Sequence, residues 1–305
     1  MASRFGRLLL AVTELSAVRS IVTGTRPGRA LSSRFVAGET LDQAIEVARL
    51  LNAKNASVSL DHLGEHVADR ATAEAAREGY LRALDRIAAE EIDGNISIKL
   101  TQLGLGADDD LAAASVSTLA SRAAALDRTV TIDMEESRYT EQTIAIFEKT
   151  QAQHGNVGIA IQSYLRRSTD DLERVVAAGG HVRICKGAYA EDPDAAFQSK
   201  ADVDAAFDHM TRRAMDSEAL YPAIATHDEA RIRVALDEAE WRREPWEFQL
   251  LYGVRTRLQG RLLADGFPLR VYVPYGAAWY PYLTRRIAER PANLLFFLRA
   301  LFGRR

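Results

Sequence analysis

Two lysines stand at the ends of apolar runs, where an isolated charge would be costly. Lys99 lies in an apolar run at residues 96–100, and Lys186 directly follows another at residues 182–185. A buried ammonium group without a partner is expensive, so each lysine requires an anion nearby. With Arg183 close to Lys186, the pair predicts a site for an anionic ligand or a cofactor phosphate. The alternative is that each lysine extends into solvent.

Arg285 and Arg286 could bind a carboxylate, because guanidinium groups match carboxylates well and two of them favour a carboxylic acid substrate. Adjacent helical residues diverge by about 100°, so only the length of the two side chains lets them converge. Glu289 lies about one helical turn further on and could pair with either arginine. A solvated charged helix face would produce the same pattern.

Asp133 and His227 are suited to proton transfer, although each could instead serve a different purpose. Asp133 could be a general base, a partner for a cationic substrate nitrogen, or a counter-ion to a nearby lysine or arginine. His227 could be a general acid or a metal ligand, but the six histidines are scattered and form no zinc motif, which disfavours a catalytic metal. Gly187 and Ala188 permit close approach of a ligand to the backbone, although glycine also ends strands for conformational reasons.

Eight short apolar runs must position these residues. They lie at residues 56–60, 96–100, 130–134, 157–161, 182–185, 223–225, 248–251 and 271–273. Segments with helical spacing lie between them, for example residues 71–91, 110–126, 141–153 and 202–219. Alternating β and α elements with apolar strands predict a parallel sheet, and eight repeats favour a (βα)8 TIM-type barrel, with functional residues at the C-terminal ends of the strands.

Composition limits the alternatives. The 305 residues fit one α/β barrel domain spanning 1–305, and a net charge of −3 argues against nucleic acid as a partner. No Gly-x-Gly-x-x-Gly follows a strand, which disfavours a dinucleotide-binding open sheet. No apolar stretch reaches the roughly 20 residues of a membrane span. Cys185 is the single cysteine, so no disulfide forms within the chain.

The first 40 residues hold six arginines, no lysine and two acids, Glu14 and Glu39. This composition is typical of a mitochondrial transit peptide. The alternative, which we expect, is an N-terminal helical extension at 1–40 packed on the barrel. At the other end, residues 279–302 predict a long helical segment interrupted near Pro291.

Nine motifs occur in an order and spacing that are specific to one family. They lie at residues 34–40, 60–65, 99–104, 132–135, 161–165, 183–191, 225–228, 249–253 and 282–286. Over nearly the whole chain they resemble the flavoprotein proline dehydrogenases. The resemblance implies a distorted (βα)8 barrel that carries FAD, with the C-terminal helix lying over the barrel mouth. It also places the domain start before residue 40, so removal of residues 1–40 is not expected.

The resemblance further implies oxidation of L-proline by hydride transfer from the carbon next to the ring nitrogen to flavin N5, which gives Δ1-pyrroline-5-carboxylate. Asp133 and Arg183 match catalytic positions. The implied substrate-binding residues are Lys99, Leu251, Tyr272, Tyr282, Arg285 and Arg286, and the implied flavin contacts are Met134, Gln162, Arg183, Lys186, Gly187, Ala188, Tyr189, Thr226, His227 and Glu289. Tyr272 favours proline over hydroxyproline, whose users have a smaller residue there.

Family members pass electrons to a membrane quinone, so we expect a cytoplasmic protein with peripheral contact to the inner membrane rather than a mitochondrial one. The basic N-terminus or the apolar residues 294–298 could make that contact, and coupling to a pyrroline-5-carboxylate dehydrogenase is also implied. Arg290 and Pro291 depart from the family's usual Asn-Gly, which leaves the path after Glu289 open. The competing hypotheses are a Schiff-base or metal-dependent barrel enzyme using Lys99 or Lys186, and a flavin-binding regulatory protein.

Overall fold

Eight parallel strands close into a barrel in the computed structural model, which describes residues 32–288. Each strand pairs with the next along the chain, and the last pairs with the first. The strands are β1 (Ser57–His62), β2 (Gly94–Lys99), β3 (Val130–Asp133), β4 (Val157–Gln162), β5 (Gly180–Cys185), β6 (Leu220–Ala225), β7 (Glu247–Leu251) and β8 (Leu269–Tyr275). All eight predicted strands are confirmed, and with them the barrel.

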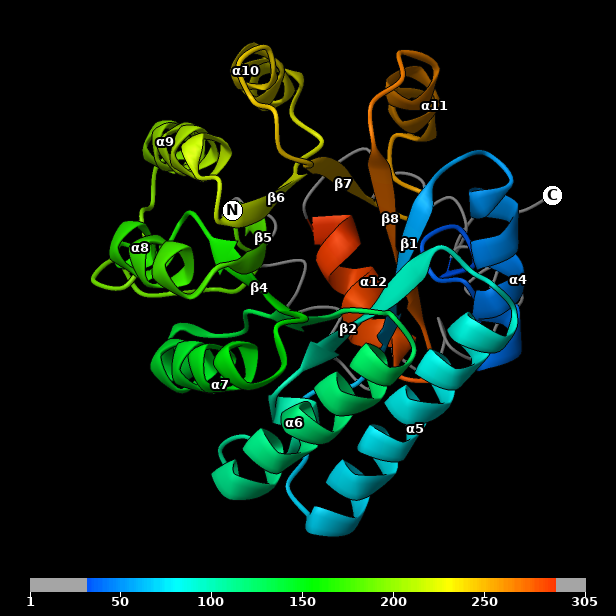
Figure 1. The fold of residues 1–305 in the computed structure, drawn as a ribbon. Coiled ribbons are helices and arrows are strands. Elements are labelled where there is room, and N and C mark those ends of the chain that lie inside the picture. Colours follow the sequence, from blue (N-terminus) through cyan, green and yellow to red (C-terminus); the bar gives the residue numbers. More distant parts are fainter. Residues whose placement is uncertain (1–31, 289–305) are drawn as a thin grey trace, which may run out of the picture.

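One helix before the first strand and the helices between the later strands form an outer ring around the barrel (Figure 1). They are α4 (Leu41–Asn52), α5 (Arg70–Ala89), α6 (Asp109–Ala125), α7 (Thr140–His154), α8 (Ser168–Ala178), α9 (Lys200–Asp216), α10 (Glu229–Ala239) and α11 (Thr256–Ala264), with short 3₁₀ turns at Thr101–Leu103 and Ser137–Tyr139. Side chains that accept hydrogen bonds from first-turn amides begin several of them, as Asp69 does for α5 and Asp108 for α6. The sequence therefore encodes these helix starts locally.

The two faces of the strands carry different chemistry. Ile96 and Ile98 on β2 and Ile132 on β3 belong to the main apolar core. The residues between them point to the opposite face, because side chains alternate along a strand. There Ser97 Oγ donates to Asp133 Oδ1 at 2.7 Å. The apolar core thus lies on the helix side of the sheet, and charged and polar groups occupy this part of the barrel interior.

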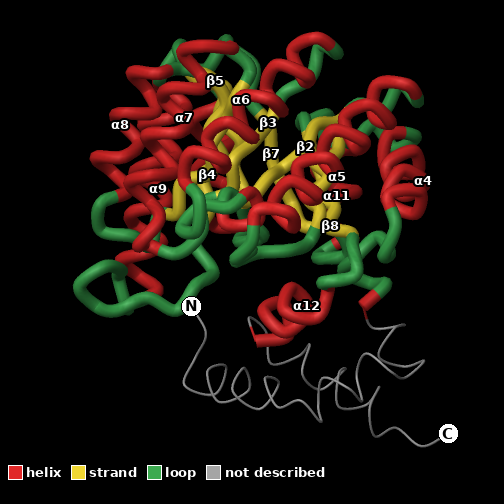
Figure 2. Tube along the Cα trace, turned by 90° about the horizontal axis from the view of Figure 1, so that it is seen from below, coloured by secondary structure: helices red, strands yellow, loops and turns green. Residues whose placement is uncertain are grey.

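One further helix, α12 (Trp279–Ala288), crosses the end of the barrel. It lies at the centre of the ring in Figure 1 and beyond one end of the strands in Figure 2. Arg285 on this helix bonds Glu65, which follows β1. That contact identifies the covered end as the one where the strands finish, so the predicted helix over the barrel mouth is confirmed.

Residues 33–40 form turns that support α12. Phe35 and Val36 are buried in a small apolar cluster with Trp279 and Leu283 of the helix. This stretch also contacts the β7–α11 connection at Gly253, whose φ is 71°. A Cβ added at Gly253 would lie 1.6 Å from the carbonyl oxygen of Arg34.

The left-handed backbone alone costs a non-glycine residue about 1–2 kcal/mol. We expect Gly253→Ala to lower the free energy of unfolding by more than this amount. The additional loss arises because the backbone at Arg34 must move. Gly155→Ala is the matched control, since Gly155 has φ 73° and an added Cβ would meet nothing within 4 Å. Urea unfolding measures both, and equal losses in the two variants would show that the contact with Arg34 is unimportant.

Among the described residues, no helix combines the length and the apolar character needed to cross a bilayer. Most of the predicted N-terminal extension, Glu289 and the apolar residues 294–298 lie outside the described residues.

Candidate functional site

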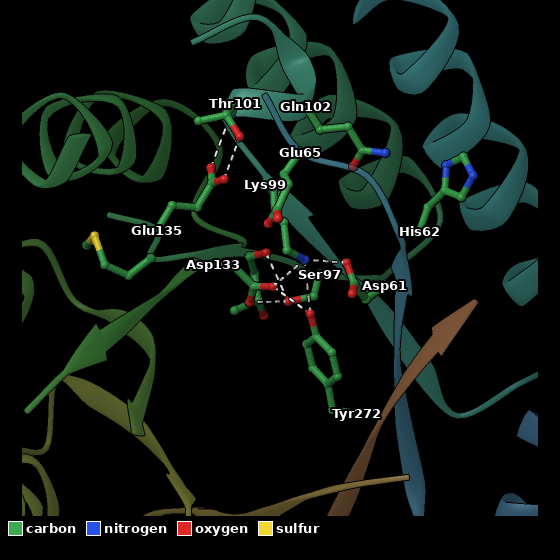
Figure 3. A network of polar contacts seen from close by, with 12 residues as sticks. Asp61, His62, Glu65, Ser97, Lys99, Thr101, Gln102, Asp133, Glu135 and Tyr272 are labelled. Atoms are coloured by element: carbon green, nitrogen blue, oxygen red, sulfur yellow. Dashed lines mark hydrogen bonds and ion pairs between the residues drawn. The ribbon is translucent and has the colours of Figure 1, made fainter. Parts of the chain in front are cut away.

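Four strands bring charged side chains together in the barrel interior. Lys99 Nζ at the end of β2 lies 2.7 Å from Asp61 Oδ1 on β1 and 3.3 Å from Asp133 Oδ2 on β3. Tyr272 on β8 donates from its hydroxyl to Asp133 Oδ2 at 2.7 Å. Figure 3 shows these side chains pointing toward one another. Three of the predicted site residues, Lys99, Asp133 and Tyr272, therefore form one cluster.

Arg183 on β5 joins this cluster from the opposite side of the barrel. Its Nη1 forms an ion pair with Asp133 Oδ1 and donates to Ser97 Oγ at 3.0 Å. The guanidinium carbon lies 5.2 Å from the centre of the Tyr272 ring, at cation–π distance. The two predicted catalytic residues, Asp133 and Arg183, are thus direct partners.

The cluster is ionised at neutral pH. Burial opposes the charged form of Asp133, but the charges of Lys99 and Arg183 outweigh it and hold the pKa of this carboxyl below its ordinary value. Burial likewise opposes the ammonium of Lys99, yet the carboxylates of Asp61 and Asp133 raise the pKa of that lysine. Two cations and two anions therefore compensate one another in the barrel interior.

The helix over the mouth carries the arginine pair. Arg285 Nη1 lies 2.8 Å from Glu65 Oε1, and its guanidinium carbon lies 5.8 Å from the Tyr189 ring centre. The guanidinium of Arg286 lies 5.1 Å from the Tyr282 ring centre on the same helix. Burial opposes the charge of Arg285, but Glu65 raises the pKa of this arginine. The two guanidinium groups therefore have different neighbours, and that of Arg285 is bound by a carboxylate.

The predicted flavin contacts come from the ends of β3 to β6. Gln162 at the end of β4 donates from Nε2 to the Met134 carbonyl at 2.7 Å, while its Oε1 is buried without a hydrogen-bond partner among the described residues. Gly187 has φ 109°, and an added Cβ would lie 2.2 Å from the Tyr164 ring. Ala188 directly follows Gly187, beyond β5. A larger residue than glycine does not fit at this turn.

Lys186 has a different environment from Lys99. Its ammonium lies 2.5 Å from Asp204 Oδ1 on α9 and 2.9 Å from Asp228 Oδ2 before α10. Burial opposes the charge of Asp228, but the bond from Lys186 outweighs it and lowers the pKa of that carboxyl to about 2. Lys186 is therefore bound by two carboxylates at the rim and does not join the central cluster.

Two more predicted contacts lie between β6 and β7. Thr226 Oγ1 accepts from the amide of Asp228 at 3.1 Å, and His227 Nε2 accepts from the amide of Leu251 at 3.2 Å. The bond to Leu251 fixes the imidazole beside the end of β7 and sets Nε2 as the acceptor nitrogen.

Three partners of the cluster, Asp61, Ser97 and Gln249, were absent from the predicted site residues. Asp61 is 0% exposed and is the last residue but one of β1, so the anion that Lys99 requires could have been sought there. Ser97 and Gln249 carry no such signal, because their neighbours in the sequence do not show which side chains they meet inside the barrel. Their role depends on which strand ends meet across the barrel.

Comparison with known proteins agrees with this architecture. The model of the family described as proline dehydrogenase matches residues 44–299. Proline dehydrogenase 1 of Bacillus subtilis subsp. natto is 37% identical over 281 residues, which cover 91% of this chain and 92% of that protein. Proline dehydrogenase of Deinococcus radiodurans is 33% identical over 280 residues, which cover 89% of this chain and 90% of that protein.

Among solved structures, proline utilization A from Bdellovibrio bacteriovorus, inactivated by N-propargylglycine, superposes with a TM-score of 0.81 at 21% identity. The match covers 91% of this chain but 34% of that one, so the chain spans about a third of the larger protein's length. At this identity the likeness shows the fold. The family match and the two relatives show more: the chain belongs to the proline dehydrogenase family, oxidoreductases that act on proline.

Proposed function

We propose that this protein oxidises L-proline to Δ1-pyrroline-5-carboxylate, with FAD as the hydride acceptor and a membrane quinone as the next electron acceptor. The observation that carries the proposal is the position of Arg285 and Arg286 on a helix across the barrel mouth, above the cluster of Lys99, Asp133 and Arg183. A double cation at the mouth of a barrel matches a small amino acid carboxylate.

The residues present fit a flavin. Gln162 Oε1 and Arg183 Nη2 are buried side-chain atoms without a hydrogen-bond partner in the described part of the chain, one an acceptor and the other a donor. An isoalloxazine edge offers both an N–H donor and acceptor atoms. Gly187 itself has no side chain to shield its backbone from a ligand, although the Tyr164 ring occupies the position that a Cβ would take. We infer that Met134, Gln162, Arg183, the 186–189 turn, Thr226 and His227 hold FAD, which supplies the two-electron acceptor.

The substrate carboxylate would be bound by Arg285, Arg286 and Lys99. Glu65 binds Nη1 of Arg285, so the proline carboxylate would be bound by the other N–H groups of that guanidinium. Leu251, Tyr272 and Tyr282 would form the wall around the pyrrolidine ring and exclude water. Binding would therefore fix the ring by its carboxylate at one end and by apolar contact along its length.

The reaction requires removal of a hydride from the ring carbon next to nitrogen and loss of one proton from that nitrogen. The nitrogen lone pair forms the new C=N bond, so the amine must be neutral when the hydride leaves. Burial of the bound amine in the barrel mouth would oppose its charged form and lower its pKa. The proton leaves to solvent as proline binds, and Asp133 serves to hold Lys99 and Arg183 in place.

A Schiff-base mechanism through Lys99 fits the geometry less well. An amine nucleophile must be unprotonated, whereas Asp61 and Asp133 raise the pKa of Lys99 and keep it an ammonium. Lys186 is likewise bound by two carboxylates.

Downstream partners follow from the product. The cyclic imine would be oxidised further by a pyrroline-5-carboxylate dehydrogenase, and reduced flavin would be reoxidised by quinone at the cytoplasmic face of the inner membrane.

The test is an anaerobic absorption spectrum near 450 nm before and after L-proline is added. Bleaching by L-proline but not by D-proline is the expected result. A yellow protein that proline does not reduce would contradict the activity and favour a flavin-binding regulatory role. A colourless protein that does not take up FAD would contradict the cofactor.

A further inference from the structure

A row of polar residues lies beneath Arg183, toward the end of the barrel where the strands begin. Arg183 Nε donates to Gln249 Oε1 on β7, and Gln249 Nε2 donates to Glu247 Oε1 at 2.6 Å. Glu247 also accepts from Arg270 Nε on β8 at 2.8 Å and from the Tyr221 hydroxyl at 3.2 Å. Arg270 in turn donates to the Val58 carbonyl at 3.0 Å.

The chemistry of the row fixes the orientation of the Gln249 amide. An arginine can only donate hydrogen bonds, and an ionised glutamate can only accept them. Gln249 is the adapter between the two, because its oxygen must face Arg183 and its nitrogen must face Glu247. The Glu247 carboxylate is 2% exposed as a residue and held by Arg270, so the amide cannot turn over without losing two bonds.

This orientation restricts the Arg183 guanidinium. Gln249 binds Nε from below, and Asp133 and Ser97 bind Nη1 from β3 and β2. The remaining nitrogen, Nη2, is buried and has no hydrogen-bond partner among the described residues. With two nitrogens held from different sides, the plane of the guanidinium is set, and with it the direction in which Nη2 points.

We propose that Gln249, oriented by Glu247 and Arg270, is a positioning residue for Arg183: it aims Nη2 at the bound flavin and so sets the rate of hydride transfer and the flavin midpoint potential. The inference rests on the proposed function, because it assigns Arg183 to the flavin. Gln249, Glu247 and Arg270 act through Arg183 and do not themselves touch the reacting atoms.

The test compares Gln249→Met with the parent protein by anaerobic stopped-flow reduction with L-proline and by redox titration of the bound flavin. A displacement of about 1 Å in a group at the reacting centre can cost about 100-fold in rate, so we expect the limiting rate of flavin reduction to fall by at least about tenfold. The KM for L-proline should change by less than about threefold, because Arg285 and Arg286, which would bind the substrate carboxylate, are unaltered. The midpoint potential should also shift, since a cation near the flavin has moved.

Gln151→Met is the matched control. Gln151 is also a buried glutamine, on α7, and its side chain accepts a bond from the Val157 amide at 2.9 Å and makes no described hydrogen bond with Arg183. Gln151→Met should lose about as much stability as Gln249→Met does, while its flavin midpoint potential and rate of flavin reduction stay equal to those of the parent. A structural role for Gln249 would give the same pattern in both variants and would overturn the proposal.

Gln249→Glu keeps the test decisive if the methionine variant does not fold or loses flavin. The new carboxyl lies against the buried Glu247 carboxylate, so it should stay protonated, accept from Arg183 Nε through one oxygen and donate to Glu247 through the other. This variant should therefore keep the rate of flavin reduction and the midpoint potential close to those of the parent. A folded, flavin-loaded Gln249→Glu variant whose reduction rate falls tenfold or more would overturn the inference, because the two bonds that orient Arg183 would be kept. If the parent itself is not reduced by L-proline, the proposed function fails, and the potentials, measured with a chemical reductant, still decide the positioning role.

Discussion

Replacing Arg286 with alanine should lower kcat/KM for L-proline steeply while flavin remains bound. Truncating one partner of a buried, hydrogen-bonded charge pair costs about 2–5 kcal/mol. At 1.36 kcal/mol per factor of ten, this corresponds to about 30-fold to a few thousandfold in kcat/KM. Arg286 should show this loss because its guanidinium, beside the Tyr282 ring, would bind the substrate carboxylate. Steady-state kinetics with L-proline measure the effect, and absorbance near 450 nm measures flavin retention.

Two comparisons separate carboxylate binding from general damage. Pyrrolidine has the same ring without the carboxylate, so the Arg286→Ala variant should oxidise it nearly as well as the parent does. Arg257→Ala removes the same charge from an exposed position on α11 and should leave proline kinetics unchanged. Proline kinetics in Arg286→Ala equal to those of the parent would rule out carboxylate binding by Arg286. Arg286→Lys should have a kcat/KM between those of the parent and of Arg286→Ala, because lysine keeps the charge but lacks the planar guanidinium.

Lys99→Met should lower the free energy of unfolding by about 3–5 kcal/mol, because removal of one partner leaves buried charges uncompensated. Asp61 is 0% exposed and loses its ion pair with Lys99, while Asp133 loses one of its two cations. Urea unfolding followed by circular dichroism measures the loss. Lys149→Met on α7 is the control, because Lys149 is exposed. A surface substitution of this kind usually changes the free energy of unfolding by no more than about 0.5 kcal/mol.

The pH dependence gives this prediction a second test. In the parent protein the pKa of Asp133 lies below its ordinary value, so its ionised carboxyl contributes stability above about pH 3.9, and that stability is lost as the pH falls through the lowered pKa. In Lys99→Met the pKa of the Asp133 carboxyl should rise, because Arg183 is then, among the described residues, the one remaining cation that opposes the effect of burial. As the pH falls from 7 toward 5, protonation of Asp133 removes a buried negative charge that Lys99 no longer balances. The difference in free energy of unfolding between the parent and the variant should therefore shrink. A deficit that grows over this range would contradict an electrostatic origin of the loss.

The polar barrel interior links stability and function in this protein. Ion pairs join Lys99 to Asp61 and Asp133, Arg183 to Asp133, and Arg270 to Glu247. Gln249 connects Arg183 to Glu247, so these groups form one polar row inside the barrel. Tightly coupled buried ion pairs add little stability over apolar packing, but they are costly to break. The arrangement therefore holds two cations rigidly below the mouth, where the proposed reaction needs them.

The repeating elements were predictable because their signals are local. The strand at residues 157–161 was predicted from five consecutive residues and begins as predicted, and the helix predicted at 110–126 is observed at Asp109–Ala125 behind its capping residue Asp108. Capping and apolar runs depend on neighbours within a few residues. Eight such repeats then imply closure, because a parallel sheet of this length with helices along one face curls into a barrel.

The chain by itself also determined where chemistry would occur, since polar residues that end apolar strands meet at one rim of a barrel. Lys99 and Asp133, 34 positions apart in sequence, are indeed partners. Which atoms pair was decided by tertiary structure alone. Lys186 resembles Lys99 in sequence, yet α9 and α10 supply Asp204 and Asp228 to it, whereas the register of β1 with β2 supplies Asp61 to Lys99. Gln249 gained its role because β7 lies two strands from β5 in the barrel, where its side chain meets that of Arg183, and this placement is set by the pairing of the strands, not by any local pattern.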